Sequence, residues 1–232
     1  MSRIRPEISR APAGPARLAW GGLCAVLAIA VATGAWSLLR GSAEAEAPAS
    51  LETLGEYGSV PDFSLTERSG RPVSKSDLAG GFWVADFIFT RCNGICPVLT
   101  SRMSSLASAI SSIPGGDQVR FVSFSVDPAW DTPEVLSAYA ETAGGNVAAE
   151  GRWLFLTGSR DVLYRLIGEG FHLSVADRSA DPQAQGELVT HSDRFVLVDP
   201  RGQIRAYYHG TDEDSVARLK RDLERLIRQE GS

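Results

Sequence analysis

Two kinds of hydrophobic pattern alternate along most of this 232-residue chain. Short apolar stretches rich in aromatic and β-branched residues indicate buried strands, and segments whose apolar residues recur every three or four positions indicate amphipathic helices. A third pattern occurs near the N-terminus, where residues 18–39 form a run of 22 residues without a charge. The chain therefore divides into an apolar N-terminal run and a longer part built from strands and helices.

From Pro61 onward the pattern predicts a hairpin around Ser69-Gly70 and another around Pro200-Arg201-Gly202. Between them it predicts three strands, at residues 83–89, 119–126 and 153–158. Helices are predicted from about Cys96 through Ile110, from Thr132 to Thr142, from Ser159 to Gly168, and from Asp214 to Gln229. This order of elements is that of a thioredoxin-like α/β fold, with a central mixed sheet flanked by helices.

The apolar run 18–39 predicts a single N-terminal transmembrane helix, because at about 1.5 Å per residue it spans a hydrocarbon core of about 30 Å. Four arginines precede it, so the positive-inside rule keeps the N-terminus in the cytoplasm and exports the rest. A cleaved signal peptide is the alternative, but the run is longer than a typical signal-peptide core. The predicted organisation is a cytoplasmic tail (1–17), an anchor (18–39), a linker (40–57) and an exported domain (58–232).

Composition narrows the class of protein. The chain is 44% hydrophobic and 22% charged, as in an ordinary globular protein. Its net charge of −5 argues against a nucleic-acid partner, since phosphates require a basic surface. After residue 40 there are 18 basic and 27 acidic residues, a net of −9, so the exported part is acidic. Of the three cysteines, Cys24 lies in the apolar run and is interpreted as a small hydrophobic residue.

The other two cysteines, Cys92 and Cys96, directly follow the predicted strand at 83–89. Pro97 places the start of the next helix near Cys96, because proline is tolerated only in the first helical turn. At a helix N-terminus the free N–H groups and the helix dipole lower the pKa of a thiol, so both cysteines are predicted to be reactive. Such a pair can form a disulfide, structural or redox-active, or bind a soft metal ion such as copper(I).

A third copper ligand is expected to be a histidine, because imidazole suits both oxidation states of copper. His191 lies immediately before a predicted strand, on the segment that packs against the cysteine loop in thioredoxin-type folds. His172, at a helix end, and His209, at the end of the last hairpin, are interpreted as solvated. The predicted metal site is therefore Cys92, Cys96 and His191.

In these segments the chain resembles the Sco/SenC family of copper-binding proteins, which serve cytochrome c oxidase assembly. The resemblance covers roughly residues 58–230 and rests on FIFTRCNGICPVLTSRM, SFSVDPAWDTPEVLSAYA, FLTGSRDVLYRL and VTHSDRFVLVDPRGQI. It implies a thioredoxin-like domain, anchored in the bacterial inner membrane and facing the periplasm, that binds copper through Cys92, Cys96 and His191. The implied partners are the copper site of oxidase subunit II and other periplasmic copper chaperones or thioredoxin-like reductants.

Two positions depart from the pattern of that family. Asn93 stands where proline is common, and Thr190 stands where an aspartate often precedes the histidine. Asp86 lies six residues before Cys92, a spacing that resembles the buried aspartate of thioredoxin, which assists proton transfer. An aspartate satisfied by the backbone at a strand end is the alternative interpretation of Asp86.

The segment between the second strand and the second helix also carries candidate residues. Asp131 is predicted to be the N-cap of that helix, with Pro133 in its first turn. Asp127 is predicted to tune the charge of the thiol site, to contact a partner, or to form a turn with the proline that follows it. Trp130 is predicted to be exposed and is a candidate for contact with a partner.

Three functions compete at this point. The leading hypothesis is a copper metallochaperone that binds one copper ion. The alternative is a thiol-disulfide oxidoreductase that reduces the cysteines of the oxidase copper site, which needs Cys92 and Cys96 as catalytic residues but not His191. The third is a thiol peroxidase, although Phe89 and Ala85 stand where peroxiredoxins carry a threonine and a proline. The sequence does not decide whether the protein is an enzyme.

Overall fold

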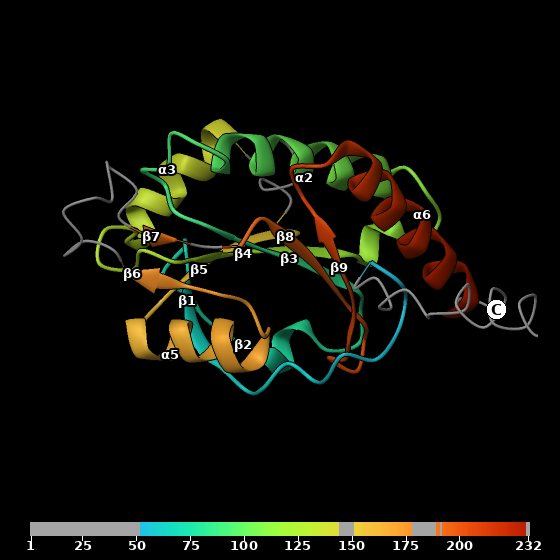
Figure 1. Ribbon diagram of the computed structural model, residues 1–232, viewed down its shortest axis with the longest axis horizontal. Helices are drawn as coiled ribbons and strands as arrows, with labels where there is room; N and C mark the ends of the chain where they lie inside the picture. The colour runs from blue at the N-terminus through green and yellow to red at the C-terminus, as the bar shows by residue number, and fades with distance from the viewer. Residues whose placement is uncertain (1–51, 144–150, 178–188, 191, 231–232) are drawn as a thin grey trace, which may run out of the picture. The chain divides into compact units, whose positions relative to one another are not determined.

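The centre of the domain is a group of three parallel strands (Figure 1). The computed structural model describes residues 52–143, 151–177, 189–190 and 192–230. The three strands are β3 (Trp83–Ile88), β4 (Arg120–Ser125) and β5 (Trp153–Thr157), and all their side chains except that of Arg120 are buried. Burial on both faces explains why they read as continuous apolar runs rather than alternating ones. The three predicted strands are confirmed.

Antiparallel strands extend this centre on both sides into a seven-stranded mixed sheet. On one side lies the predicted first hairpin, β1 (Ser64–Glu67) and β2 (Pro72–Ser74), and on the other the predicted last hairpin, β8 (Arg194–Val198) and β9 (Ile204–His209). The strand order is β2-β1-β5-β4-β3-β8-β9. Because β8 runs antiparallel to β3, the start of β8 lies at the edge of the sheet where β3 ends.

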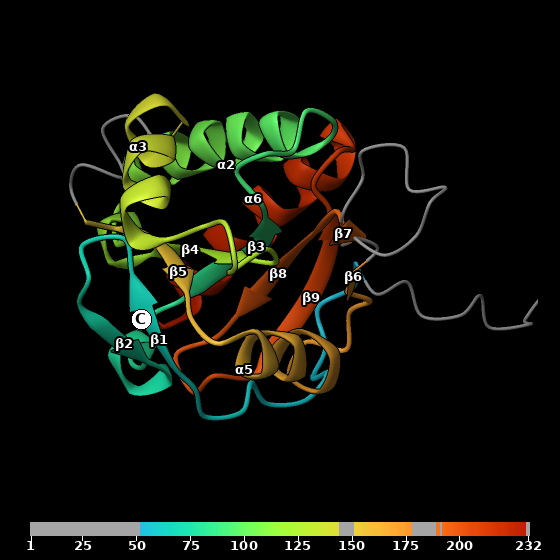
Figure 2. The same cartoon turned by 90° about the vertical axis from the view of Figure 1, so that its left-hand side faces the viewer.

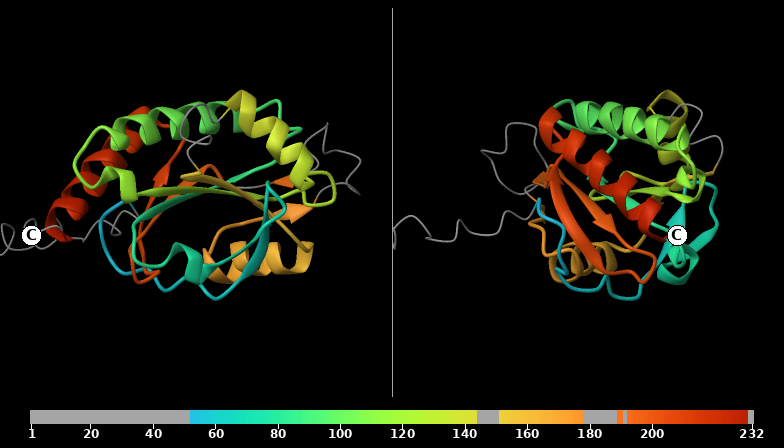
Figure 3. Two further views of the ribbon diagram at one scale, coloured as in Figure 1. Left: turned by 180° about the vertical axis from the view of Figure 1, so that it is seen from behind. Right: turned by 90° about the vertical axis from the view of Figure 1, so that its right-hand side faces the viewer.

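Helices cover both faces of the sheet (Figures 1 and 2). On one face lie α2 (Cys96–Ser111), α3 (Pro133–Ala143) and α6 (Glu213–Glu230), and on the other lies α5 (Arg160–Arg165) with the short 3₁₀ helix η1 (Lys75–Leu78). The view from behind shows the same two layers of helices (Figure 3). The predicted mixed sheet flanked by helices is confirmed.

The apolar faces of these elements form the core. In α2, Leu99, Met103, Leu106 and Ile110 recur at helical spacing and are all buried, as predicted. Aromatic rings fill the core as well: the centroids of Phe87, Phe124 and Phe171 lie 5.1–5.8 Å apart in three pairs. Burial of each large apolar side chain contributes about 1.5–3 kcal/mol to the stability of the fold. This packing therefore fixes the end of β3, from which the cysteine loop continues.

The predicted third helix, residues 159–168, is more irregular than its sequence pattern indicated. Only α5 is α-helical, and it continues as a π-helical turn, η3 (Leu166–Gly170), in which Phe171 N donates to Leu166 O. His172 follows with a positive φ of 54°, a conformation in which the helix cannot continue. The helix predicted from Ser159 to Gly168 is thus confirmed, as α5 followed by η3, and so is the predicted place of His172 at a helix end.

Two short strands were not predicted from the sequence. β6 (Ala176–Asp177) and β7 (Val189–Thr190) pair antiparallel in a separate two-stranded sheet. Two residues are too few for an alternating pattern, so nothing in the sequence distinguishes these strands from a loop. Thr190, the neighbour of His191, belongs to β7.

The predicted anchor (18–39), the cytoplasmic tail and Cys24 lie outside the described residues. Among the residues that are described, no helix is long and apolar enough to cross a bilayer. The described chain is ordered against the sheet from its start, since Gly55 N donates to Arg205 O and Tyr57 N to Ile204 O, both at 2.9 Å.

Candidate metal and thiol site

The two cysteines lie where the β3–α2 loop enters the helix. Cys96 is the first residue of α2 and is fully buried, whereas Cys92 is partly exposed in the loop, and both are thiols. The backbone N–H of Cys96 points at Cys92 Sγ, 3.5 Å away. The N-cap residue Ile95 has no polar side chain and Pro97 has no N–H, so the Cys92 sulfur takes the place of a capping oxygen. The predicted position of both cysteines at the helix start is confirmed.

The two thiols differ chemically. The hydrogen bond with Cys92 and, second, burial raise the pKa of the Cys96 thiol far above its usual range. A backbone hydrogen bond from Phe89 lowers it, but by less, and the nearby charge of Asp86 raises it further. The prediction that the helix terminus lowers the pKa of both thiols is therefore wrong for Cys96, because desolvation and the second sulfur outweigh the helix dipole there.

A buried carboxylate fixes the loop just before Cys92. Asp131 Oδ1 accepts hydrogen bonds from Thr90 Oγ1 at 2.6 Å and Thr90 N at 3.2 Å, and Asp131 Oδ2 accepts one from Ser125 Oγ at 2.6 Å. The prediction that Asp131 caps α3 is wrong, since Thr132 Oγ1 accepts the hydrogen bond from Val135 N at 3.4 Å. Pro133 is the first residue of α3, as predicted. Asp131 instead joins the ends of β3 and β4, which lie side by side in the sheet.

Arg91, the residue before Cys92, is held by two neighbours from the β4–α3 turn. Its guanidinium donates to Asp127 Oδ2 from Nη2 at 2.5 Å and from Nε at 3.2 Å. The same guanidinium lies 4.6 Å from the ring centre of Trp130, within the range of a cation–π contact. Trp130 is exposed, as predicted, and Asp127 faces the cysteine loop through this ion pair.

Close to the thiols lies a group of buried and partly buried polar residues. Asp86, on β3, is fully buried, and its charge acts on Cys96. Tyr139 OH on α3 and Thr100 Oγ1 on α2 are hydrogen-bonded at 2.7 Å. Burial chiefly raises the pKa of Tyr139 to about 12, and the cysteines and Asp86 add to it. The predicted buried aspartate is thus confirmed in its place, whereas nothing in the sequence singled out Tyr139.

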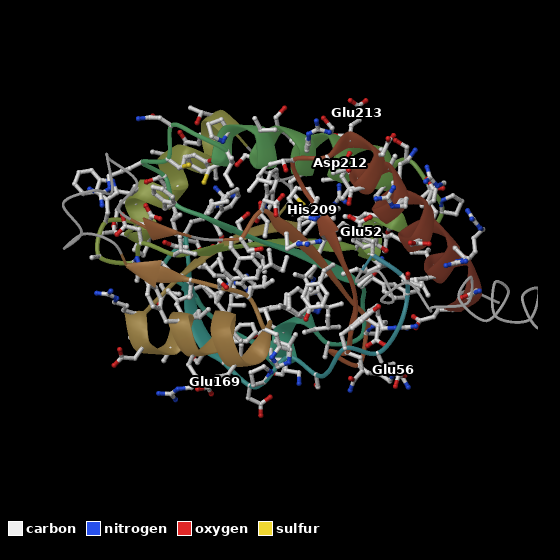
Figure 4. The ribbon with its side chains drawn as sticks, viewed as in Figure 1. Glu52, Glu56, Glu169, His209, Asp212 and Glu213 are labelled. Carbon is white, nitrogen blue, oxygen red and sulfur yellow. The ribbon has the colours of Figure 1, made fainter. Side chains whose placement is uncertain are left out.

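His191 lies outside the described residues. Among the residues that the structure describes, no group of three or more His, Cys, Asp or Glu is arranged to hold a metal ion. The other two histidines are accounted for without a metal. His172 is exposed, and His209 Nδ1 lies 3.0 Å from Asp193 Oδ2. His209 is therefore hydrogen-bonded to Asp193 rather than simply solvated, and it lies near the start of α6 with Asp212 and Glu213 (Figure 4).

The comparison with known families is decisive. The family model described as SCO1/SenC matches residues 52–228, most of the chain and nearly all of its described part. The chain belongs to the SCO1/SenC family. A family relative, the SCO1 protein homolog of Bacillus subtilis, is 33% identical over 66% of this chain and 75% of its own length. A putative copper-binding protein of Stutzerimonas stutzeri is 28% identical over 64% of this chain and 68% of its own length.

Solved structures of family members share the fold. BsSco, described as a member of the Sco family of cytochrome c oxidase assembly proteins with a disulfide switch, is 29% identical with a TM-score of 0.63. The alignment covers 76% of this chain and 98% of that one. ScoI of Arabidopsis thaliana, solved with copper bound, is 24% identical with a TM-score of 0.62 and coverages of 74% and 99%. The SCO1/SenC assignment and the thioredoxin-like fold predicted from sequence are both confirmed.

Proposed function

We propose that this chain is a copper chaperone for cytochrome c oxidase assembly, which binds one copper ion through Cys92, Cys96 and His191 and passes it to the copper site of subunit II. The observation that carries the proposal is the pair of thiols at the start of α2, at the sheet edge where β8 begins. Membership of the SCO1/SenC family, with relatives described as copper-binding, supplies the choice of metal.

The donor set fits copper. Two sulfurs at one helix start offer the soft ligands that copper(I) prefers. Cys92 is partly exposed and Cys96 is buried, so a bound ion would be shielded on one side and reachable on the other. The high pKa of Cys96 in the copper-free protein means that metal binding must release its proton, which makes the affinity depend on pH.

Chain connectivity supports His191 as the third ligand. It is two residues before Asp193, whose carbonyl accepts a hydrogen bond from Gly210 N at 2.9 Å. Gly210 is so close to the first turn of α2 that an added Cβ would lie 2.5 Å from Leu99 Cδ2. Asp193 therefore lies near the end of α2 that carries Cys96, and His191 is only two residues away from it in the sequence.

The proposal includes the location of the domain. With residues 18–39 as a single-pass anchor and the N-terminus in the cytoplasm, the acidic domain faces the periplasm, where the copper site of an oxidase subunit II is assembled. Other periplasmic copper chaperones or thioredoxin-like reductants would load or reduce the protein there.

A copper titration tests the ligand set. The full-length reduced protein in detergent should bind about one copper ion per chain under anaerobic conditions. Replacing Cys92 or Cys96 by Ser should abolish tight binding, and His191→Ala should change the copper(II) spectrum and weaken binding. His209→Ala is the matched control, because it removes a histidine at the same end of the sheet that pairs with Asp193. An unchanged copper(II) spectrum in His191→Ala would refute the three-ligand site.

Reduction of partner cysteines is the second candidate, favoured by the buried Asp86 beside Cys96 and by the disulfide switch described for BsSco. In that reaction Cys92 and Cys96 form a disulfide, and the partner's disulfide gains their two electrons and two protons. It requires both cysteines but not His191. Restoration of oxidase activity in a deletion strain therefore separates the two functions: His191→Ala should fail to restore it if the protein delivers copper, and should succeed if it only reduces thiols.

A further inference from the structure

The exposed apolar side chains of the domain gather around the thiols. Among the described residues only three large hydrophobic side chains are exposed: Ile95 at 38%, Val98 at 44% and Trp130 at 50%. Ile95 and Val98 flank Cys96 in the sequence, and Trp130 reaches the cysteine loop through its contact with Arg91. A concentration of exposed apolar groups at a single site marks an interaction surface rather than chance exposure.

We infer that Ile95, Val98, Trp130 and Arg91 form a docking surface for a protein partner that brings its own sulfur ligands to Cys92 and Cys96. This inference rests on the proposed function, since only a protein that exchanges copper or electrons with another needs a partner at this position. Tryptophan and arginine are the side chains most often found to dominate binding energy when they lie at the centre of an interface.

The surface is held in place before any partner arrives. Asp127 fixes the guanidinium of Arg91 from one side, and the Trp130 ring lies against it at 4.6 Å. The hydrogen bonds from Thr90 to Asp131 tie the turn that carries Trp130 to the cysteine loop. Less side-chain freedom is then lost on binding, which favours association.

The surface continues into a groove. Between α2 and α6 lies a hollow of about 680 Å³ that extends along α2 from Pro97 and Val98 to Ala109. Its walls are mainly apolar, with Leu106, Val216 and Ala217 among the lining residues. A side chain of the partner that enters the Pro97–Val98 end of this groove would lie within one helical turn of Cys96.

The negative charge of the domain favours a protein partner over a lipid surface. The part of the chain after residue 40 carries a net charge of −9, which is repelled by anionic lipid headgroups. Two exposed carboxylates belong to the neighbouring elements, Glu134 in the first turn of α3 and Glu213 among the residues that line the groove. Arg102 and Lys220 also line the groove, and Lys220 pairs with Glu224 at 3.5 Å. The partner is thus expected to be apolar at the centre of contact and basic around it.

Kinetics of copper transfer test this surface. The full-length copper-loaded protein in detergent is mixed with copper-free subunit II of the same organism's oxidase, and the rate is measured against subunit II concentration. The double variant Val98→Ser, Trp130→Ser should raise the concentration for half-maximal rate about tenfold or more while the limiting rate stays unchanged. Added salt should raise that concentration for the unmodified protein as well.

Two controls accompany this experiment. Trp130→Phe keeps an aromatic ring over Arg91, so its concentration for half-maximal rate should stay close to that of the unmodified protein. Arg160→Gln alters another arginine–aromatic pair, Arg160 with Tyr164 on the α5 face, and should leave transfer unchanged. The copper content of every variant is measured first.

The outcomes separate this inference from the proposed function. If the unmodified protein transfers no copper to subunit II, the proposed recipient is wrong. If it transfers copper and the double variant does so at the same half-maximal concentration, the docking surface is refuted. The docking surface is equally refuted if the double variant binds less copper, because its residues would then shape the metal site.

Discussion

At the scale of single residues, burial decides how the two cysteines differ. Sequence spacing placed both at a helix N-terminus, where a thiolate is favoured, but spacing does not reveal that Cys96 is fully buried against a second sulfur. The same limit applies to Asp131. Its place before Pro133 fits an N-cap, and only the fold shows that Thr132 takes that role while Asp131 turns inward to Thr90.

This difference predicts the order in which the thiols react. In the reduced, copper-free protein at neutral pH, iodoacetamide should label Cys92 at least about tenfold faster than Cys96, because thiolate is the nucleophile and Cys96 is buried with a raised pKa. Mass spectrometry of the two labelled positions, in the single variants Cys92→Ser and Cys96→Ser as well as the native chain, measures the two rates. Faster labelling of Cys96 would contradict the asymmetry.

The pH dependence of stability should reveal the buried carboxyl of Asp131. Burial raises its pKa in the folded state above its value in the unfolded chain, so the folded state binds the proton more tightly. Its contribution to stability is complete below the unfolded pKa of about 3.9 and is lost as pH rises through the raised folded pKa. Asp131→Asn lacks this titration.

Urea unfolding at a series of pH values from about 3.5, just below the unfolded pKa, up to about 7 tests that expectation. The free energy of unfolding of the native chain minus that of Asp131→Asn should fall as pH rises. At neutral pH the variant should still be less stable, by about 1–3 kcal/mol, because it weakens the hydrogen bonds to Thr90 and Ser125. A difference that grows with pH would mean that Asp131 titrates at or below its ordinary pKa.

At the scale of elements, hydrophobic periodicity was sufficient wherever an element is long and buried. It located β3, β4, β5, α2 and α6 within a few residues, because their apolar side chains meet a single core. It predicted a helix through most of η3 but not the change there from α-type to π-type hydrogen bonds, which leaves the pattern unchanged. It missed β6 and β7, which are too short to have a pattern.

Packing between elements at the cysteine end should be sensitive to one added methyl group. In Gly210→Ala the new Cβ would lie 2.5 Å from Leu99 Cδ2 and 2.9 Å from Asp193 O, so α2 or the start of β8 must move. We expect a loss of about 1–3 kcal/mol in the free energy of unfolding. Gly168→Ala is the matched control, since nothing lies within 4 Å of its Cβ position, and it should be neutral or slightly stabilising. Equal stabilities of the two variants, measured by urea unfolding, would show that the first turn of α2 can move away from the added methyl group at no cost in stability.

At the scale of the whole molecule, the sheet explains why residues far apart in the sequence meet at the thiols. Parallel β3 and β4 bring the loops before Cys92 and Trp130 to one edge, and antiparallel β8 brings the segment after His191 to the same edge. The element order predicted this convergence in outline. It could not supply the contacts of Arg91 with Asp127 and Trp130, because those depend on side-chain directions in two loops.

The same sheet also predicts where the stable unit must begin. A chain starting at Ser59 should be less stable than one starting at Ser50 by about 2–4 kcal/mol, since backbone hydrogen bonds contribute about 1 kcal/mol each and an edge-to-face ring pair about as much. The shorter chain cannot form the hydrogen bonds from Gly55 N to Arg205 O, Tyr57 N to Ile204 O and Ile204 N to Gly58 O, the Tyr57–Tyr207 ring pair at 5.7 Å, or the ion pair of Glu52 with Arg218. Urea unfolding of both chains measures the difference, and equal midpoints would mean that this segment adds nothing to the fold.

The shorter chain should also bind copper less tightly. Glu52 contacts α6 and its neighbours contact β9, so the shorter chain loses contacts that hold α6, and α6 packs against α2, the helix that begins at Cys96.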